Sequence, residues 1–468
     1  MMKPMARNLL ASAGSDAGNR LLGFFATAYL ARVMGPQSFG LISVGISVLS
    51  YCILFAGPGL NVLATRTVAA TPGPMLEFSR DVLGVRTMLA AAWAMIATLA
   101  TFAFYGYSSA WATIAVFGFT AVPLALAPDW YVQGKGGMVA LAVARFLMSV
   151  TYLLMLVVLV HGPGDTVWTA VAFCAGNCVM AAALGVTFNR MAGPFRLRVN
   201  LRRLWELLQE SYPLGLSTFL TQTVMNLPVL IVAAVLSSKE TGLFGAAMKL
   251  VFFALMIDRV FYLLFLPVAS RAYVAGPDRM RHVTVLGLKM VLLVALPVGL
   301  AGVFNADWVV TIVFGAGFSN AAEAFKWMMP YFVTTVVSTV MMTVLFATQR
   351  ERDFLKVLVP GTIAVVVFCA ILTYQMGIAG SAAGLSAGEF VMTVMLIRQV
   401  ITKQPFPLAA TILPFVGSAI LMGITLSLLS AMHPVLSSLV GSMVFAGSSI
   451  LFRGFTREDV QVLRERIA

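Results

Sequence analysis

The chain has 468 residues, of which 60% are hydrophobic and 10% charged, and its mean hydropathy is +0.94. Since about 20 apolar residues form one helical crossing of a bilayer, apolar runs of this density exclude a soluble domain of useful size and predict a polytopic membrane protein. The net charge of +13 is carried by residues that flank the apolar runs, not by one patch with interleaved aromatic side chains, so we expect anionic lipid of the bilayer as its partner and no nucleic acid.

Taken in chain order, the apolar runs predict about fourteen transmembrane helices joined by short polar connections. We expect each boundary to within about four residues. The expected spans are 8–33, 39–65, 84–105, 109–130, 138–160, 166–188, 212–236, 242–268, 284–304, 326–347, 355–376, 379–400, 407–430 and 435–452.

Successive connections alternate between rich and poor in Lys and Arg. Positive residues in short loops stay on the cytoplasmic side of a membrane. If both termini are cytoplasmic, the outer connections contain only Arg32, Lys239 and Lys326, and the other flanking basic residues are inside. The sequence therefore predicts cytoplasmic termini and an even number of spans.

Two halves of the chain resemble each other. The turn between the first two spans, ARVMGPQSFGL at 31–41, aligns with AAVLSSKETGL at 233–243, and LATR at 63–66 aligns with VASR at 268–271. Six spans followed by six related spans in the same direction imply two lobes related by an axis along the membrane normal, with a cavity between them.

The expected fold is therefore all-α and integral to the membrane, with two pseudo-symmetric six-helix lobes around a central cavity and two further C-terminal helices. Its expected parts are an N-lobe at 1–189, a cytoplasmic amphipathic linker at 190–210, a C-lobe at 211–402, extra spans at 403–452 and a cytoplasmic tail at 453–468. The apolar stripe of the linker consists of Leu201, Leu204, Leu207 and Leu208. We expect this stripe to lie in the membrane interface, with a simple connecting segment as the alternative.

Polar and charged side chains interrupt several of the expected spans. Ionisable residues at membrane depth are costly, so a functional role is the default expectation for them. The candidates are Asp16, Asn19 and Arg20 in the first span, Gln222 and Asn226 in the seventh, Lys249, Asp258 and Arg259 in the eighth, and Glu389 in the twelfth.

Five segments spread along the chain carry a family resemblance. They are GSDAGNRLLGFFATAYLARVMGPQSFG (14–40), DWYVQGKGGM (129–138), LRRLWELLQESYPLGLSTFLTQTV (201–224), TGLFGAAMKL (241–250) and VFGAGFSNAAEAF (313–325). This set resembles the Wzx-type polysaccharide flippases of the multidrug/oligosaccharidyl-lipid/polysaccharide (MOP) exporter superfamily. The resemblance implies alternating access by two lobes in a bacterial inner membrane, and movement of a polyprenyl-pyrophosphate-linked oligosaccharide to the outer leaflet for surface or exo-polysaccharide biosynthesis. It also implies H⁺ or Na⁺ as a coupling ion and polysaccharide polymerase or export machinery as partners.

Hydrocarbon would leave the pyrophosphate and sugars of such a substrate unsatisfied, so the pathway should offer fixed positive charge and polar groups. We expect Arg20, Lys249 and Arg259 to hold the pyrophosphate. Asp16 would orient Arg20 or act as a protonatable partner, with a purely structural ion pair as the alternative. The polar lining would be completed by Asn19, Gln222 and Asn226.

Three further expectations carry alternatives. Arg66 and Arg271 either receive the head group at the cytoplasmic mouth or are ordinary cytoplasmic flanks. Glu389 either couples transport to an ion or has a packing or hydrogen-bonded role, and Asp258 beside Arg259 could lie near the cytoplasmic end of its span, where charge costs little.

The chain departs from the family pattern at Asn226, where many relatives have an acid, which puts ion coupling through that position in doubt. The segment RLLGFFAT at 20–27 keeps the leading Arg of the lipid II flippases and lacks their later Arg-Asp pair, which favours another polyprenyl-linked saccharide as substrate.

Enzymatic function finds little support in the sequence. The three histidines fall in separate connections, and no phosphate-binding Gly-rich loop, nucleophile elbow or metal-ligand spacing occurs, so we expect no catalytic residues, metal or cofactor. The alternative transporter is an ion-coupled multidrug or small-cation exporter of the same superfamily. Such an exporter should line its cavity with carboxylates, whereas Arg20 and Lys249 would repel its substrates.

Overall fold

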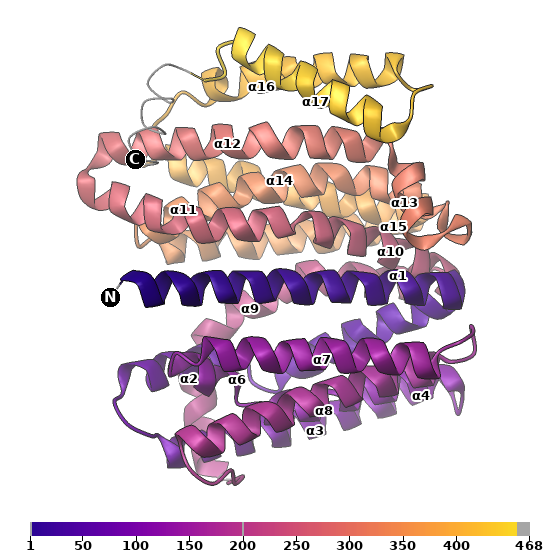
Figure 1. The fold of residues 1–468 in the computed structure, drawn as a ribbon, viewed down its shortest axis with the longest axis vertical. Helices are drawn as coiled ribbons and strands as arrows, with labels where there is room; N and C mark the ends of the chain where they lie inside the picture. The colour runs from indigo at the N-terminus through magenta and orange to yellow at the C-terminus, as the bar shows by residue number, and fades with distance from the viewer. Residues whose placement is uncertain (1, 199–200, 456–468) are drawn as a thin grey trace. The chain divides into compact units, whose positions relative to one another are not determined.

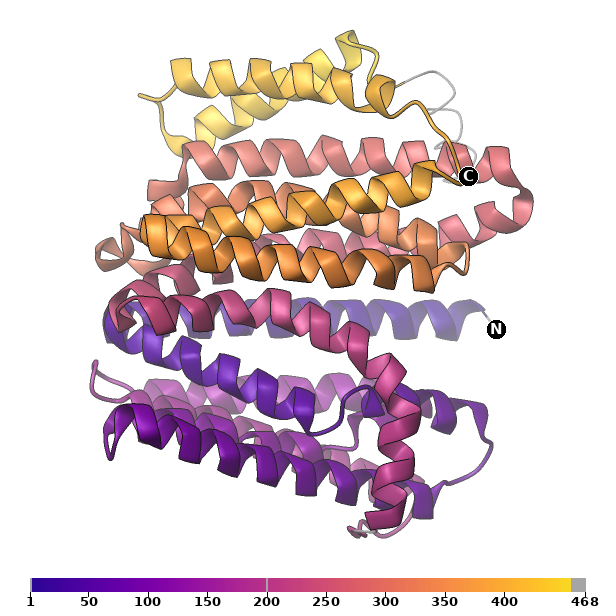
Figure 2. The same ribbon diagram turned by 180° about the vertical axis from the view of Figure 1, so that it is seen from behind.

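The structure is a computed structural model that describes residues 2–198 and 201–455, and side chains within this range apart from those of residues 2–17, 19, 20, 201, 202, 213 and 214. The described ranges contain helices and connections, with no strand (Figures 1 and 2). The chain divides into two compact units, Met1–Gly245 and Ala246–Ala468.

The helices of the first unit follow one another with short connections. They are α1 (Met2–Phe55), α2 (Leu60–Ala70), α3 (Leu76–Tyr105), α4 (Ser109–Phe119), α5 (Ala121–Leu126), α6 (Asp129–Gly134), α7 (Met138–Leu159), α8 (Thr166–Met191), α9 (Leu201–Val235) and the first turns of α10 (Ser238–Ala254).

The second unit contains the rest of α10 and the remaining helices. They are α11 (Met256–Ala275), α12 (Pro277–Phe304), α13 (Ala306–Phe314), the short 3₁₀ helix η1 (Ala316–Phe318), α14 (Ala321–Ala347), α15 (Glu351–Ile401), α16 (Leu408–Leu428) and α17 (Pro434–Leu451).

Twelve helical stretches of the described chain are long and apolar enough to cross a membrane. Two of them contain a glycine outside the helical region, Gly35 in α1 (φ 72°) and Gly377 in α15 (φ 62°), and each of these two stretches overlaps two of the predicted spans. The chain is therefore an all-α, multi-pass membrane protein, as the sequence predicts.

Two predicted spans are broken by proline. The span expected at 39–65 ends at Phe55, because Pro58 has no N–H to continue the helical bonding, and α2 starts afresh at Leu60. The span expected at 109–130 is divided into α4, α5 and α6. Pro123 cannot bond the carbonyl four residues earlier, where α4 ends, and Pro128 precedes α6 in the same way.

Three leucines of the predicted linker pack against protein, while the side chain of the fourth, Leu201, lies outside those the structure describes. Leu207 is fully buried and packs, with Leu204 and Leu208, in a cluster that includes Trp130 and Phe188. The sequence predicts membrane interface as the partner of this stripe, but the structure places protein there. The helix that carries these leucines continues without interruption into the next predicted span. Helix α9 is therefore one continuous helix that changes direction along its length (Figure 2).

Helix α14 is the centre of the second unit. Most of its side chains are buried, and it packs against α11, α12 and α15 (Figure 1). Helices α16 and α17 pair with each other and pack against α12. A position on α14 therefore meets side chains from several helices, which is the condition for building a site inside this unit.

Candidate functional site

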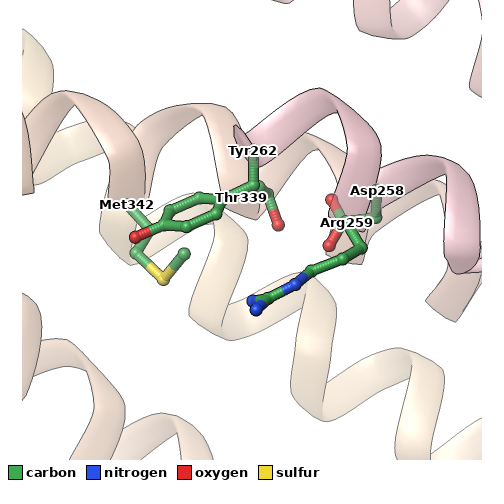
Figure 3. A pocket seen from close by; sticks show the side chains of 5 residues that line it. All are labelled: Asp258, Arg259, Tyr262, Thr339 and Met342. Atoms are coloured by element: carbon green, nitrogen blue, oxygen red, sulfur yellow. The ribbon is translucent and has the colours of Figure 1, made fainter. Parts of the chain in front are cut away.

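A pocket of about 230 Å³ opens between α11 and α14 in the second unit (Figure 3). Asp258, Arg259 and Tyr262 of α11 line it on one side, and Thr339 and Met342 of α14 line it on the other. The pocket therefore combines a cation, a carboxylate, a hydroxyl and an aromatic ring. This is a lining that suits a polar ligand group with both charge and hydrogen-bonding capacity.

The Arg259 side chain is exposed, and its guanidinium carbon lies 6.0 Å from the centroid of the Tyr262 ring. These two residues are one helical turn apart, so the aromatic face helps to hold the cation in place. The guanidinium presents a planar fork of N–H donors, which matches the oxygens of a phosphate or carboxylate. Arg259 can thus receive an anionic group from the pocket.

The Asp258 carboxylate has an unused acceptor. The Thr339 hydroxyl, which donates to the Thr335 carbonyl at 3.2 Å, lies near this carboxylate, whose Oδ1 is buried and has no hydrogen-bond partner in the part of the chain that the structure describes. The charge of Arg259 also acts on this carboxylate. A free buried carboxylate oxygen can accept a bond from a ligand hydroxyl or hold a proton.

The depth of this pair can be judged from the helix. The apolar stretch of α10 and α11 runs from Ser238 to Ala275, 38 residues, and Asp258 and Arg259 lie near its middle. One alternative from the sequence placed them near the cytoplasmic end of a span. Helix α11 continues beyond the pair to Ala275, and a functional role for the two residues stays a prediction.

Glu389 of α15 is buried on another side of α14, at 2% exposure, and does not line the pocket. The Ser338 hydroxyl hydrogen-bonds its carboxylate, and Ser338 Oγ is 2.8 Å from Thr393 Oγ1. Asp258 and Glu389 are close enough to act on each other electrostatically. The adjacent residues Ser338 and Thr339 therefore connect α14 to two carboxylates, one enclosed and one at the pocket.

The two amides of α9, in the first unit, bond to each other. Asn226 Nδ2 donates to Gln222 Oε1 and to the Gln222 carbonyl, both at 3.1 Å. Both side chains are partly buried. The pair thus forms a polar strip on one helix face, with the remaining amide capacity of each residue open to a ligand.

The other predicted residues lie apart from these groups. Lys249 of α10 is partly buried and has no hydrogen bond or ion pair within the described residues. Arg66 of α2 and Arg271 of α11 are exposed, and Arg271 Nε donates to the Pro267 carbonyl at 3.3 Å. The predicted roles of Asp16, Asn19 and Arg20 concern side chains outside those the structure describes.

The pocket also contains three residues that were not predicted from the sequence, Tyr262, Thr339 and Met342. Tyr262 had a signal, because it follows Arg259 by three residues and so shares its helix face. Thr339 and Met342 come from a different apolar helix, and nothing in that run indicates which face meets α11.

Comparison with known proteins gives consistent results. The family described as polysaccharide biosynthesis protein matches residues 5–273, which is more than half of the chain. An Escherichia coli (strain K12) protein named "Putative O-antigen transporter" is 22% identical over 413 residues, covering 84% of this chain and 96% of that protein.

Two solved structures share the fold. The lipid II flippase MurJ, in an inward closed conformation, has a TM-score of 0.75 at 12% identity and covers 95% of this chain and 99% of its own. An inward-facing multidrug resistance MATE family transporter of the MOP superfamily has a TM-score of 0.64 at 15% identity, covering 83% and 96%. These findings confirm the predicted fold class and family resemblance, and the chain belongs to the polysaccharide biosynthesis protein family.

Proposed function

We propose that this protein is a flippase that moves a polyprenyl-pyrophosphate-linked oligosaccharide from the cytoplasmic to the outer leaflet of a bacterial inner membrane, by alternating access. Three findings support the proposal: the family, the O-antigen transport named for the E. coli relative, and the fold shared with a lipid II flippase. All three point to a transporter and not to an enzyme. In this proposal both chain termini are cytoplasmic, as the distribution of Lys and Arg indicates.

The observation that carries the proposal is the exposed Arg259 in the pocket between α11 and α14, near the middle of a membrane-spanning stretch. A permanent cation at that depth is costly unless it meets an anion or water. A pyrophosphate supplies the anion, since its oxygens accept the forked N–H donors of Arg259. The neighbouring Tyr262 ring and the free oxygen of Asp258 suit the apolar face and the hydroxyls of a sugar.

The size of the pocket limits which part of the substrate it can hold. About 230 Å³ is smaller than the usual pocket for a drug-sized ligand, so this pocket suits the pyrophosphate and an adjoining sugar unit but not a whole oligosaccharide. Lys249, Asn19, Arg20, Gln222 and Asn226 remain candidates for contacts with other parts of the head group. Arg66 and Arg271 are candidates for its first capture, and Asp16 for orienting Arg20.

One observation favours a second function, the export of small organic cations with H⁺ or Na⁺ coupling. The carboxylates of Asp258 and Glu389 lie on either side of the same part of α14, and the fold is also that of a multidrug transporter. Carboxylates attract cations, but here one of them adjoins the guanidinium of Arg259. That neighbour opposes entry of a cation at the pocket, so the flippase remains the favoured function.

The two functions can be separated in proteoliposomes. We would measure the fraction of a polyprenyl-pyrophosphate oligosaccharide that becomes accessible to an external glycosidase over time, with the native protein, Arg259→Ala and Arg352→Ala. Arg352 is an exposed arginine of α15 away from the pocket and serves as the matched control.

We expect native protein and Arg352→Ala to speed this exposure, and Arg259→Ala to slow it by about tenfold or more, since hydrogen bonds to charged groups contribute about 1.5–3 kcal/mol. Native protein that leaves the saccharide unmoved but transports a cationic dye would replace the flippase with the cation exporter.

A further inference from the structure

Two glycines of the first unit touch each other backbone to backbone. Gly40 lies in α1 just after its break at Gly35, and Gly242 lies in the first turns of α10. A Cβ placed on either glycine would lie 2.9 Å from the backbone N of the other, and each Cβ would also collide with a carbonyl, that of Ser238 or that of Pro36. Neither position can carry a side chain unless the two backbones move apart.

The contact is reciprocal. In the alignment of 31–41 with 233–243, Gly40 corresponds to Gly242 and Pro36 corresponds to Ser238. Gly40 meets the carbonyl of Ser238, which lies four residues before Gly242. Gly242 in turn meets the carbonyl of Pro36, which lies four residues before Gly40. This is the pattern of a self-complementary contact between two repeated segments.

The contact continues one turn further along both helices. A Cβ on Gly245 would lie 3.1 Å from the Cβ of Ser43. Ser43 is buried, and its hydroxyl bonds the Phe39 carbonyl of its own helix at 2.9 Å. No side-chain hydrogen bond between α1 and α10 is present at these described positions. At these positions the contact between α1 and α10 therefore consists of van der Waals packing.

The flanking segments favour a contact that can open as a unit. On one side, Gly35 (φ 72°) interrupts α1 and leaves it a joint five residues before Gly40. On the other, Ser237 and Glu240 fix the start of α10, because the Ser237 N–H and hydroxyl donate to the Glu240 carboxylate at 3.0 and 2.8 Å. Small residues in contact separate without breaking polar bonds.

We propose that the Gly40–Gly242 contact is the closed outer gate of the transport pathway. This inference rests on the proposed function, because the connections at residues 33–38 and 236–241 face outward only in the proposed topology. A pathway that alternates between two sides must close on one side while it is open on the other, and a contact with two discrete arrangements meets that need. Opening the gate separates the two backbones and exposes the residues behind them, of which Ser47 is 3% exposed when the gate is closed.

The first test measures access to Ser47. In a protein whose Cys52, Cys174, Cys178 and Cys369 are replaced by alanine, Ser47→Cys is labelled from outside with a membrane-impermeant maleimide. Gly40→Ala and Gly242→Ala prevent closure, so we expect each to raise the labelling rate by about tenfold. Gly185→Ala is the matched control, because nothing lies within 4 Å of its Cβ position in α8, and it should leave the rate unchanged.

The second test closes the gate by a covalent bond. The pair Ser43→Cys and Gly245→Cys brings two Cβ atoms near the 3.5–4.5 Å typical of disulfides. We expect a disulfide under mild oxidation, loss of saccharide transport to the protein-free level, and recovery of transport with a reductant. An oxidised protein that still transports at the native rate, or a pair that does not cross-link, would overturn the gate.

Labelling and cross-linking need no substrate, so they separate this inference from the proposed function. If the glycine variants raise labelling while native protein moves no lipid-linked saccharide, the gate stands and the substrate is wrong. If labelling is unchanged in both variants while native protein moves the saccharide, the gate is wrong and the function stands.

Discussion

The two units treat an arginine beside an aspartate in opposite ways. In the first unit, Arg86 is 6% exposed and its Nη1 lies 3.7 Å from Oδ1 of Asp129, next to the buried cluster around Trp130. In the second, Arg259 is exposed and shares a pocket with Asp258. A buried arginine that is compensated by a neighbouring, one-third exposed carboxylate links α3 to α6, whereas an arginine that faces a pocket keeps donors free for a ligand. If the proposed function holds, burial, more than residue type, distinguishes a structural charge from a functional one here.

The largest effect is expected from removal of the buried cation, Arg86. Arg86→Met leaves the Asp129 carboxylate without its counter-charge, and because the Asp129 side chain is 33% exposed we expect a loss of about 3 kcal/mol, the low end of the range for a broken buried pair. We expect a lower temperature of half-loss in detergent, read by size-exclusion chromatography, with transport per folded molecule unchanged.

The double variant Arg86→Met with Asp129→Leu removes both charges and should recover most of the stability. If Arg86→Met were as stable as the native protein and yet inactive, the pair of Arg86 and Asp129 would belong to the pathway and the contrast between the units would fail.

The exposed arginine should behave in the opposite way. Arg259→Lys keeps the charge but loses the planar fork, so we expect transport to fall severalfold, with Arg259→Ala falling further, while the thermal stability of both stays native. A loss of stability as large as that of Arg86→Met would show that Arg259 has a structural role.

Glu389 differs from both arginines, because it is a buried acid without a cation among its hydrogen-bond partners in the described part of the chain. If its role is to accept the Ser338 hydrogen bond, Glu389→Gln should keep transport within about twofold. Glu389→Leu leaves Ser338 without that acceptor and should cost about 1–3 kcal/mol of stability. Abolition of gradient-driven transport in the well-folded Gln variant would identify Glu389 as the coupling group.

The smallest effect is expected at Tyr262. Its ring lies under Arg259, and such a contact contributes about 0.5–1 kcal/mol at an exposed site. Tyr262→Leu should therefore weaken competition by inorganic pyrophosphate in the flipping assay by about two- to fivefold, while Tyr262→Phe, which keeps the ring, should match the native protein. Equal losses in both variants would assign the role to the hydroxyl.

The spans were predictable because each apolar run is long enough to cross a bilayer by itself. Less predictable was where a run is broken inside. Pro58, Pro123 and Pro128 remove backbone donors, but whether a proline bends or ends a helix depends on what surrounds it. The destination of the leucine stripe at 204–208 was also open, because protein core and membrane interface both accept an amphipathic helix.

The candidate site was predictable only where charge marked it. Arg259 and Asp258 stand out in an apolar run, and their recognition required no knowledge of packing. The sequence does not indicate that Thr339 lines a pocket, because a threonine hydroxyl can bond its own helix, as it does here to the Thr335 carbonyl at 3.2 Å. That it also lies near Asp258 follows from the packing of α14 on α11, which no local pattern encodes.

The turn at Gly377 fixes the register between the two arms of α15. It is made at one residue, with φ 62° and ψ −140°, and beyond it Gly384 and Gly388 lie against the backbones of Cys369 and Val365. One inserted residue in the second arm would turn the following residues by about 100° about the helix axis and carry both glycines off their partners. Changes in chain length should therefore be excluded from this turn, which makes it a poor place for an epitope tag.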